Sequence, residues 1–298
     1  MHPRRSSATA RLIARSTLLA AHDPARCVLV PADAVAPLTA MLAADGGGAW
    51  FRFALRHTWT RAALHALEHA VLPGIITHYL ARKRWLERAV TATLDAGCSQ
   101  VVVLGAGFDT LAWRLHRDRP GVHFFELDHP ATQAPKRRAL GAAPNLTFLA
   151  ADLATASPAA LLRACPAFSP DKPALFVAEG LLMYFPEKRA GALLREIATL
   201  SRPPVEVLFT FMDQTPDGAI NFRGESAAIG WWLRWRREPF QWGIARAVLS
   251  GFLQPFGLHL SVVVAHDDLR AQFLAPFGLA RLPLARGECV CRCSTIAP

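Results

Sequence analysis

Long stretches without charge are almost absent from this sequence. Among its 298 residues, only positions 247–266 run without Asp, Glu, Lys or Arg for the length that a membrane-spanning helix needs. Gly251, Pro255 and Gly257 interrupt this stretch and favour a helix, a turn and a strand. An export signal is also missing, because Arg11 and Arg15 break the apolar run that such a signal keeps continuous. We therefore expect a soluble, cytoplasmic protein with no membrane partner.

Cysteine spacings typical of disulfide frameworks or zinc sites are missing as well. The chain has six cysteines and no C-x2-C pair, which excludes the usual structural zinc motifs. Cys289, Cys291 and Cys293 alternate with other residues, so a strand would place all three on one face. We expect them to pack in an apolar core, and we expect no metal cofactor.

Lysine is scarce, since only four of the 33 basic residues are lysines, so arginine carries most of the net charge of +10. Such a charge could attract nucleic acid, a phosphorylated substrate or an acidic protein. The arginines are scattered and form no long basic run. The fourth predicted strand also lacks the Asn/Asp-Pro-Pro-aromatic signature of base-amino methyltransferases. We therefore expect a solvated arginine-rich surface and no nucleic-acid partner.

The apolar pattern changes near position 100. Before it, helical spacing covers 8–21, 32–44 and 58–96, with a glycine loop at 46–48 and a break at Pro73-Gly74. After it, β-branched or aromatic runs begin at 101, 123, 146, 174 and 205 and alternate with helical patterns, and two further strands follow at 258–265 and 288–294. This order predicts an α/β fold with a doubly wound, seven-stranded, mostly parallel sheet. We expect a helical cover at 1–97 and a binding core at 98–298.

A tryptophan-rich insert interrupts this core at 213–243. It contains Trp231, Trp232, Trp235 and Trp242 and is too long and too aromatic for a plain connection. We predict a helical lid over the binding site, because large aromatic surfaces outside a regular core commonly line ligand pockets. The alternative is that these tryptophans only cover sheet edges.

Glycines follow the first predicted strand. Gly105 and Gly107 let the backbone turn sharply and approach a ligand at the carboxyl end of the strand, where such sheets bind nucleotides. A dinucleotide fingerprint would need a third glycine at the position of Thr110. The motif alone is therefore not specific.

Acidic residues follow the next three strands. Asp128 is placed to hold both hydroxyls of a ribose, Asp152 could accept from an adenine amino group, and Glu179 ends the fourth strand. The first of four successive strands thus ends in a glycine loop, and each of the next three ends in an acidic residue. This set suits a positively charged nucleoside without phosphates, which describes S-adenosyl-L-methionine better than a dinucleotide.

At these positions the sequence resembles the leucine carboxyl methyltransferase-like proteins, which include the polyketide-synthesis O-methyltransferases and belong to the class I Rossmann-like methyltransferases. The similarity extends from about residue 8 to the last strand. The stretches that carry it are VVVLGAGFDTLAWRL at 101–115, ELDHP at 126–130, DL at 152–153, AEGLLMYFP at 178–186, PGIITHYLARKRWL at 73–86 and TA at 9–10.

The resemblance implies roles around the methionine part of the cofactor. Arg82 would pair with its carboxylate, a role suited to a bidentate guanidinium. Gly105 and Gly107 would pass beneath the methionine portion, and Glu179 would face its amino group. Lys83 follows Arg82 directly, but the resemblance gives it no role.

The resemblance also implies roles at the nucleoside and at the site of transfer. Asp128 would hold the ribose, and Asp152 with Leu153 would contact adenine. Tyr184 belongs to the motif that reaches the transfer site. The activity implied is S-adenosylmethionine-dependent O-methylation of a carboxylate or hydroxyl.

The acceptor is less well defined by the sequence. The insert favours a flat or apolar small molecule, free or carrier-bound, and Arg234, Arg236 and Arg237 could meet an anionic group or an acidic carrier protein. A protein C-terminal carboxylate is the alternative within the family, and a non-catalytic interaction protein is the alternative of another class.

Histidines in the N-terminal half raise two further questions. A hydroxyl acceptor would need a base, and His57, His65, His69 and His78 are available, but none is singled out. His65, Glu68 and His69 also match the H-x-x-E-H pattern of inverted zinc peptidases. No third ligand accompanies that pattern, so we expect no zinc.

Overall fold

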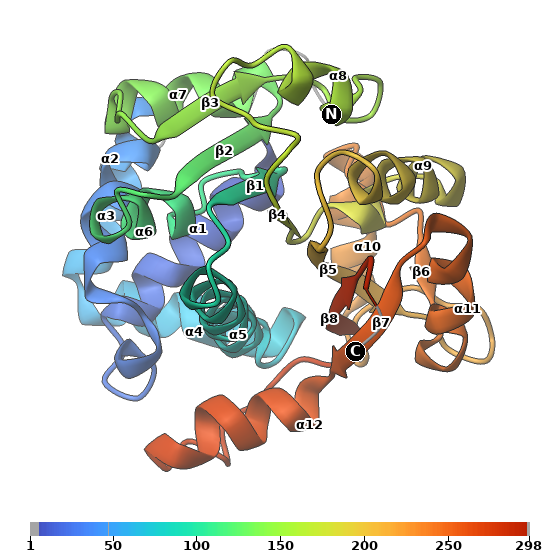
Figure 1. Cartoon of the computed structure of the whole chain (residues 1–298). Helices are drawn as coiled ribbons and strands as arrows, with labels where there is room; N and C mark the ends of the chain where they lie inside the picture. The colour runs from blue at the N-terminus through green and yellow to red at the C-terminus, as the bar shows by residue number, and fades with distance from the viewer. Residues whose placement is uncertain (1–5, 47, 297–298) are drawn as a thin grey trace.

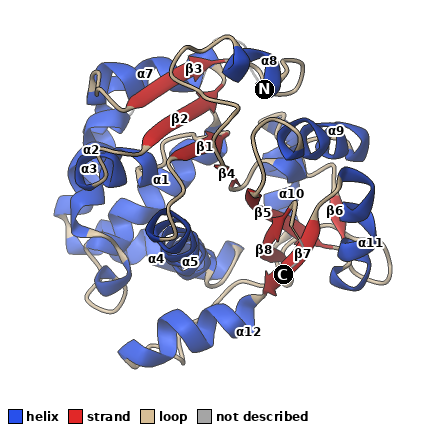
Figure 2. Cartoon of the chain, in the orientation of Figure 1, coloured by secondary structure: helices blue, strands red, loops and turns tan. Residues whose placement is uncertain are grey.

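The structure is a computed structural model, and it describes residues 6–46 and 48–296 of the chain. It is an α/β protein with one central sheet (Figure 1). Helices lie on both faces of this sheet, as expected for a doubly wound fold (Figure 2). Among the described residues, no helix is both long and apolar enough to cross a membrane.

The seven predicted strands are all present. They are β1(Gln100–Leu104), β2(His123–Asp128), β3(Leu146–Ala150), β4(Ala174–Ala178), β5(Val205–Asp213), β7(His259–Val264) and β8(Glu288–Ser294), in the order β3-β2-β1-β4-β5-β8-β7. Only β8 runs antiparallel to its neighbours, so the sheet is mostly parallel. A two-residue strand, β6(Gly243–Ile244), pairs with the end of β5 and was not predicted.

One face of the sheet packs against α8(Pro158–Arg163), α9(Glu187–Ala198) and α11(Leu249–Leu253). Leu193 and Leu194 of α9 belong to this core together with Phe125 and Phe176. Cys289, Cys291 and Cys293 lie in the same core and are buried. The prediction that these cysteines pack as apolar residues is confirmed.

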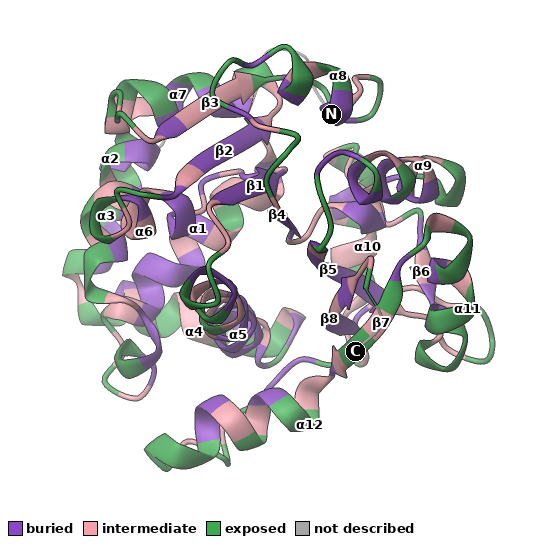
Figure 3. Ribbon diagram, viewed as in Figure 1, coloured by how far each residue is buried: buried purple, intermediate pink, exposed green. Residues whose placement is uncertain are grey.

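The opposite face packs against α5(Ile75–Asp95), α6(Leu111–Asp118) and α12(His266–Leu269). Ala81, Trp85 and Leu86 of α5 contact a core that contains Val101 and Val103. Figure 3 shows the central strands buried and the outer sides of the helices exposed. Helix α5 is therefore part of the sheet packing, although it was predicted as the last segment of the N-terminal cover.

The remaining N-terminal helices are α1(Ala8–Ala21), α2(Val35–Ala44), α3(Gly48–Arg56) and α4(Thr58–Val71). Helix α1 has the predicted limits, and the predicted segment at 58–96 divides at Gly74, which adopts φ +80°. Helix α3 was not predicted, because the glycines at 46–48 favoured a loop; Gly47 lies outside the described residues. Phe51, Ala54 and Leu55 bury one side of α3.

The insert at 213–243 is less helical than predicted. Its single helix among the described residues is α10(Ala227–Trp235), and loops form the rest, apart from the first residue of β6. Trp231 and Trp235 stack with ring centroids 6.0 Å apart, and both are exposed. Trp242 is buried in the sheet core against Phe252, so this tryptophan is not part of a lid.

Candidate functional site

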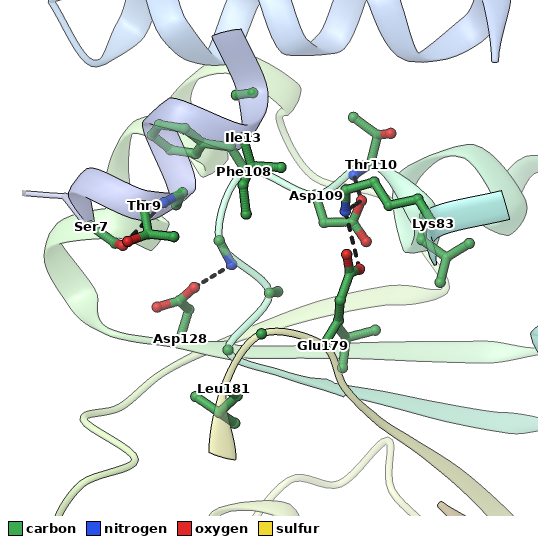
Figure 4. A pocket seen from close by; sticks show the side chains of 18 of the residues that line it. Ser7, Thr9, Ile13, Lys83, Phe108, Asp109, Thr110, Asp128, Glu179 and Leu181 are labelled. Carbon is green, nitrogen blue, oxygen red and sulfur yellow. Dashed lines mark hydrogen bonds and ion pairs between the residues drawn. The ribbon is translucent and has the colours of Figure 1, made fainter. Parts of the chain in front are cut away.

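A cavity of about 340 Å³ lies at the carboxyl ends of β1, β2, β3 and β4 (Figure 4). Parallel α/β sheets bind ligands at this edge, because the loops that follow the strands meet there. The cavity is lined by every residue to which the sequence analysis gave a role: Arg82, Gly105, Gly107, Asp128, Asp152, Leu153, Glu179 and Tyr184. Four strands and the N-terminal helices thus bring residues that are far apart in sequence to one place.

The loop after β1 has the backbone conformation that only glycine adopts easily. Gly105 has φ +65° and Gly107 has φ +50°. A Cβ atom at Gly105 would lie 2.7 Å from the Cδ1 atom of Leu181, so a larger residue would have to displace that side chain as well as adopt a positive φ. Lys136 of α7(Pro130–Leu140) donates to the carbonyl oxygen of Asp109 over 2.6 Å and supports the loop from below. These contacts fix the conformation of the loop after β1, which forms one wall of the cavity.

Asp128 lies at the end of β2 and is held by backbone donors. The amide of Gly107 donates to its Oδ2, and the amide of His129 donates to its Oδ1 over 2.5 Å. Burial raises the pKa of Asp128 above its ordinary value, while these two amides oppose that effect. The carboxylate is therefore fixed in orientation, with both oxygens at the cavity wall.

Asp152 behaves differently, because it lies in the loop after β3 and is exposed. Its Oδ1 accepts the amide of Ala154 over 3.0 Å, which forms a local turn. Leu153 beside it is buried and belongs to the sheet core. The two residues thus present one polar and one apolar group at the same end of the cavity.

A chain of ion pairs forms the other end of the cavity. Arg82 donates from Nε and Nη2 to Oε1 of Glu179 over 3.0 and 2.6 Å, and from Nη1 to both oxygens of Glu288 over 2.7 and 2.5 Å. Although burial lowers the pKa of Arg82, the carboxylates of Glu288 and Glu179 outweigh it and raise that pKa. His78 closes the chain, with Nε2 2.9 Å from Glu288. Arg82 is therefore held rigidly by two acids.

Lys83 and Asp109 also belong to this network, although the sequence analysis gave neither a role. The Nζ atom of Lys83 lies 2.9 Å from Asp109 and 3.0 Å from Glu179 (Figure 4). Burial raises the pKa of Asp109, but Lys83 and Lys136 outweigh it and bring the pKa to about 2. The only sequence signal was that Lys83 is adjacent to Arg82.

The cavity is closed on one side by Glu238 of the insert. Its Oε1 accepts the amide of Ala8 over 3.1 Å, and its Oε2 accepts the amide of Thr9 over 3.1 Å and the hydroxyl of Thr9 over 2.6 Å. A carboxylate at this position binds the free amides at the start of α1 and complements the helix dipole. The insert and α1 are thereby joined over the cavity, and nothing in the local sequence signalled this contact.

A second cavity, of about 860 Å³, adjoins the first. Thr9 and Tyr184 line both cavities. The second cavity is mainly apolar and lies between α1, α3, α4, the start of α5 and the insert; Leu19, Phe51, Leu72, Ile76, Phe222, Trp231, Trp232 and Phe240 are among its lining residues. Trp231 and Trp232 of the insert line this second cavity and not the first, so the lid over the binding site stays a prediction.

The four histidines that the sequence analysis considered as bases lie away from the two cavities. None of His57, His65, His69 and His78 lines either one, whereas His129, directly after β2, lines the first. Glu68 of the H-x-x-E-H pattern is buried, pairs with Arg26 at 3.3 Å and accepts the amide of Gly74 over 3.0 Å. Within residues 6–46 and 48–296, no three His, Cys, Asp or Glu side chains are grouped as a metal site. Glu68 has a structural role at the turn between α4 and α5.

Comparison with known proteins supports a specific family. A protein of Mycobacterium tuberculosis named "Putative S-adenosyl-L-methionine-dependent methyltransferase" is 36% identical over 166 residues, which are 54% of this chain and 52% of that protein. A protein of the same name from Mycobacterium bovis is 33% identical over 197 residues, 61% of this chain and 55% of its own length. The chain therefore spans about half the length of these curated relatives.

A solved structure shares the fold. It is the crystal structure of a putative methyltransferase from Thermobifida fusca, with a TM-score of 0.56 and 17% identity, and the match covers 86% of this chain and 93% of that one. The model of the family described as leucine carboxyl methyltransferase matches residues 11–198, which include the glycine loop, the acidic strand ends and Tyr184. The chain belongs to the leucine carboxyl methyltransferase family.

Proposed function

We propose that this protein is an S-adenosyl-L-methionine-dependent O-methyltransferase that acts on a large apolar small molecule. The observation that carries the proposal is the pair of adjoining cavities. The first has a glycine loop and a network of ion pairs. The second is lined mainly by apolar and aromatic residues, with charged side chains among them, and the two meet at Thr9 and Tyr184. The family membership and the names of the relatives support the same activity.

The residues of the first cavity fit S-adenosylmethionine. Asp128 is oriented by two amides to accept from ribose hydroxyls. Gly105 and Gly107 both line the cavity and adopt positive φ, which lets the backbone turn beside the ligand. Asp152 and Leu153 offer an acceptor and an apolar surface for adenine. At the other end, Arg82 and Lys83 would hold a carboxylate, and Glu179 an ammonium group.

The chemistry that the cofactor supplies is a methyl group on a sulfonium, which is already activated for displacement. The protein would therefore contribute alignment and exclusion of water. Correct positioning of two reactants accounts for about 7–11 kcal/mol in favourable cases. Tyr184 and Thr9, at the junction of the cavities, would orient the acceptor, and the contact between Glu238 and α1 would exclude water.

The junction favours a carboxylate over a hydroxyl as the acceptor. A carboxylate is ionised at neutral pH and needs no base, whereas a hydroxyl needs one. None of the four histidines named above lines either cavity. His129 lines only the first cavity, where its Nδ1 accepts the amide of Ala131, and the oxygens of Glu238 already accept from α1. Burial raises the pKa of Tyr184, so its hydroxyl stays protonated and can donate to an acceptor oxygen.

The apolar cavity supports a bulky acceptor of the polyketide or aromatic-acid type, free or carrier-bound. Its volume of about 860 Å³ lies in the range of pockets that enclose drug-sized molecules. A protein C-terminal carboxylate remains the alternative within the family. Methylation of a panel of apolar acids and of C-terminal peptides distinguishes the two, because activity on peptides alone would contradict a small-molecule acceptor.

Calorimetric titration with S-adenosylmethionine and S-adenosylhomocysteine tests the cofactor. We expect micromolar binding, roughly −8 kcal/mol, that Asp128→Ala abolishes while the circular dichroism spectrum stays unchanged. Asp118→Ala removes an exposed carboxylate at the end of α6 and is the matched control. If the folded wild-type protein binds neither compound, the chain is a non-catalytic member of its family and the proposal is wrong.

A further inference from the structure

Large aromatic residues gather on the surface around the mouth of the apolar cavity. Trp50 and Trp59 are each 68% exposed, Trp231 is 61% exposed and Trp235 is 60% exposed. Phe53, on α3, is 53% exposed as well. Trp50 and Trp231 line the cavity itself, so α3 and α10 contribute to the same opening. We call these five residues, with the arginines described next, the aromatic rim.

All formally charged side chains of the segments that carry this rim are arginines. Residues 48–67 contain Arg52, Arg56 and Arg61 and no Asp or Glu, and residues 226–237 contain Arg234, Arg236 and Arg237 and no Asp or Glu. The guanidinium of Arg236 lies 4.3 Å from the ring centroid of Trp235. The rim therefore combines exposed indole rings with arginines. The nearest acids in sequence are Glu68, Glu225 and Glu238, which directly flank the two segments.

We propose that the aromatic rim binds the surface of an anionic phospholipid bilayer. Tryptophan places its amphipathic ring at the level of lipid headgroups, and arginine pairs with lipid phosphates. The rim residues lie on three helices, α3, α4 and α10, or directly after α10, and helices whose exposed sides carry aromatic and arginine residues can lie flat in this interface without crossing it. The sequence alone suggested no membrane partner, because this surface exists only once the fold brings two distant segments together.

Charge argues against a second copy of this chain as the occupant. A symmetric dimer places the same patch of both copies face to face, so arginine would meet arginine. The whole chain carries a net charge of +10, which opposes self-association further. An anionic surface is the complementary partner.

Because the rim adjoins the apolar cavity, binding to a bilayer would bring that cavity close to the lipid. Two of its tryptophans, Trp50 and Trp231, line a cavity whose lining is mainly apolar. A lipid-soluble molecule could then pass from the bilayer into the cavity without crossing water. Binding to the bilayer does not depend on methyl transfer, so either proposal can fail while the other stands.

Vesicle co-sedimentation tests the inference with purified full-length protein. The wild type is expected to sediment with phosphatidylcholine vesicles that contain phosphatidylglycerol, to stay in solution with phosphatidylcholine alone, and to be released by added salt. Neither Trp59 nor Trp235 lines the cavity. The double variant with Trp59→Ser and Trp235→Ser is expected to bind these vesicles at least about tenfold more weakly than the wild type. Arg52→Gln with Arg234→Gln should weaken it by about fivefold per arginine.

Matched controls change equally exposed residues elsewhere. Phe277→Ser removes an aromatic residue that is 50% exposed and outside both segments, and Arg163→Gln with Arg281→Gln makes the same charge change as the arginine pair. The proposal is overturned if folded wild type ignores anionic vesicles, or if rim and control variants lose binding equally. Two other results would also overturn it, each in the absence of vesicle binding. In the first, the rim variants abolish binding to an acidic acyl carrier protein. In the second, they abolish a dimer that light scattering detects in the wild type.

Discussion

Glu288 belongs to a deeply buried charge cluster next to the candidate cofactor site. Its side chain is 1% exposed and accepts two bonds from Arg82, which is 2% exposed. Burial alone would raise its pKa, but Arg82 and His78 outweigh burial and lower it to about 2 from the ordinary value of 4.5. Removing one partner of a buried pair leaves the other uncompensated, so the effect on stability is large.

Glu288→Gln is expected to lower the free energy of unfolding at pH 7 by about 3 kcal/mol. Because the carboxylate has a depressed pKa in the folded state, its contribution is complete above pH 4.5 and is lost as pH falls toward 2. Urea unfolding at several pH values should therefore show wild type and variant converging in acid. Glu206→Gln, whose partner Arg292 is 34% exposed, is the control and should cost less than about 1 kcal/mol.

Single residues differ in how far sequence could predict them. Asp128 and Glu179 were predictable, because an acid that directly follows a buried strand must lie at the edge of the sheet. Glu288 and Glu238 were not, because their partners lie 206 and 229 residues away along the chain. A local pattern contains no information about such contacts, and they arise only when the strands are ordered in space.

Among the elements, α1 depends on a residue of the insert for its first turn. Glu238→Gln keeps the size of the side chain but removes the charge and one acceptor oxygen from the amides of Ala8 and Thr9. We expect a loss of about 1 kcal/mol in local stability. Hydrogen exchange of the amides at the start of α1 should then be roughly fivefold faster.

Glu187→Gln is a matched control for this element. Glu187 is an exposed acid in the first turn of α9, a helix on the other side of the sheet core. Its substitution should leave exchange in α1 unchanged. If Glu238→Gln and wild type exchange equally at Ala8 and Thr9, the insert does not hold α1 over the cavity.

Helices and strands whose apolar residues recur at a clear helical or strand spacing were predicted well. Elements in which glycines or aromatic residues obscure that spacing were not. The limits of α1 and the positions of the seven strands along the chain followed from apolar spacing, whereas their order in the sheet was not predicted. Helix α3 was missed because glycine favours a loop locally, whereas the burial of Phe51 and Leu55 stabilises a helix in the folded chain. The insert was predicted as mainly helical from its aromatic content, which reports burial or binding but not backbone conformation.

At the scale of the whole molecule, the N-terminal helices and the sheet share one set of contacts. Helix α5 packs on β1, and its Arg82 pairs with Glu179 after β4 and Glu288 on β8. The change in sequence pattern near residue 97 therefore does not coincide with a break in these contacts, and the division into a cover at 1–97 and a core at 98–298 stays a prediction. Because the shared contacts are buried, we expect the described helices and strands to unfold together.

Scanning calorimetry with and without S-adenosylhomocysteine tests this cooperativity. We expect one transition, and a ligand at 100 times its Kd should stabilise the folded state by about 2.7 kcal/mol and raise Tm by roughly 5 °C. Asp128→Ala should show one transition that the ligand does not move, because the ribose contact is lost. Two transitions of which the ligand moves only one would mean that the N-terminal helices fold separately from the sheet, and that Arg82 reaches its acids only after both parts have folded.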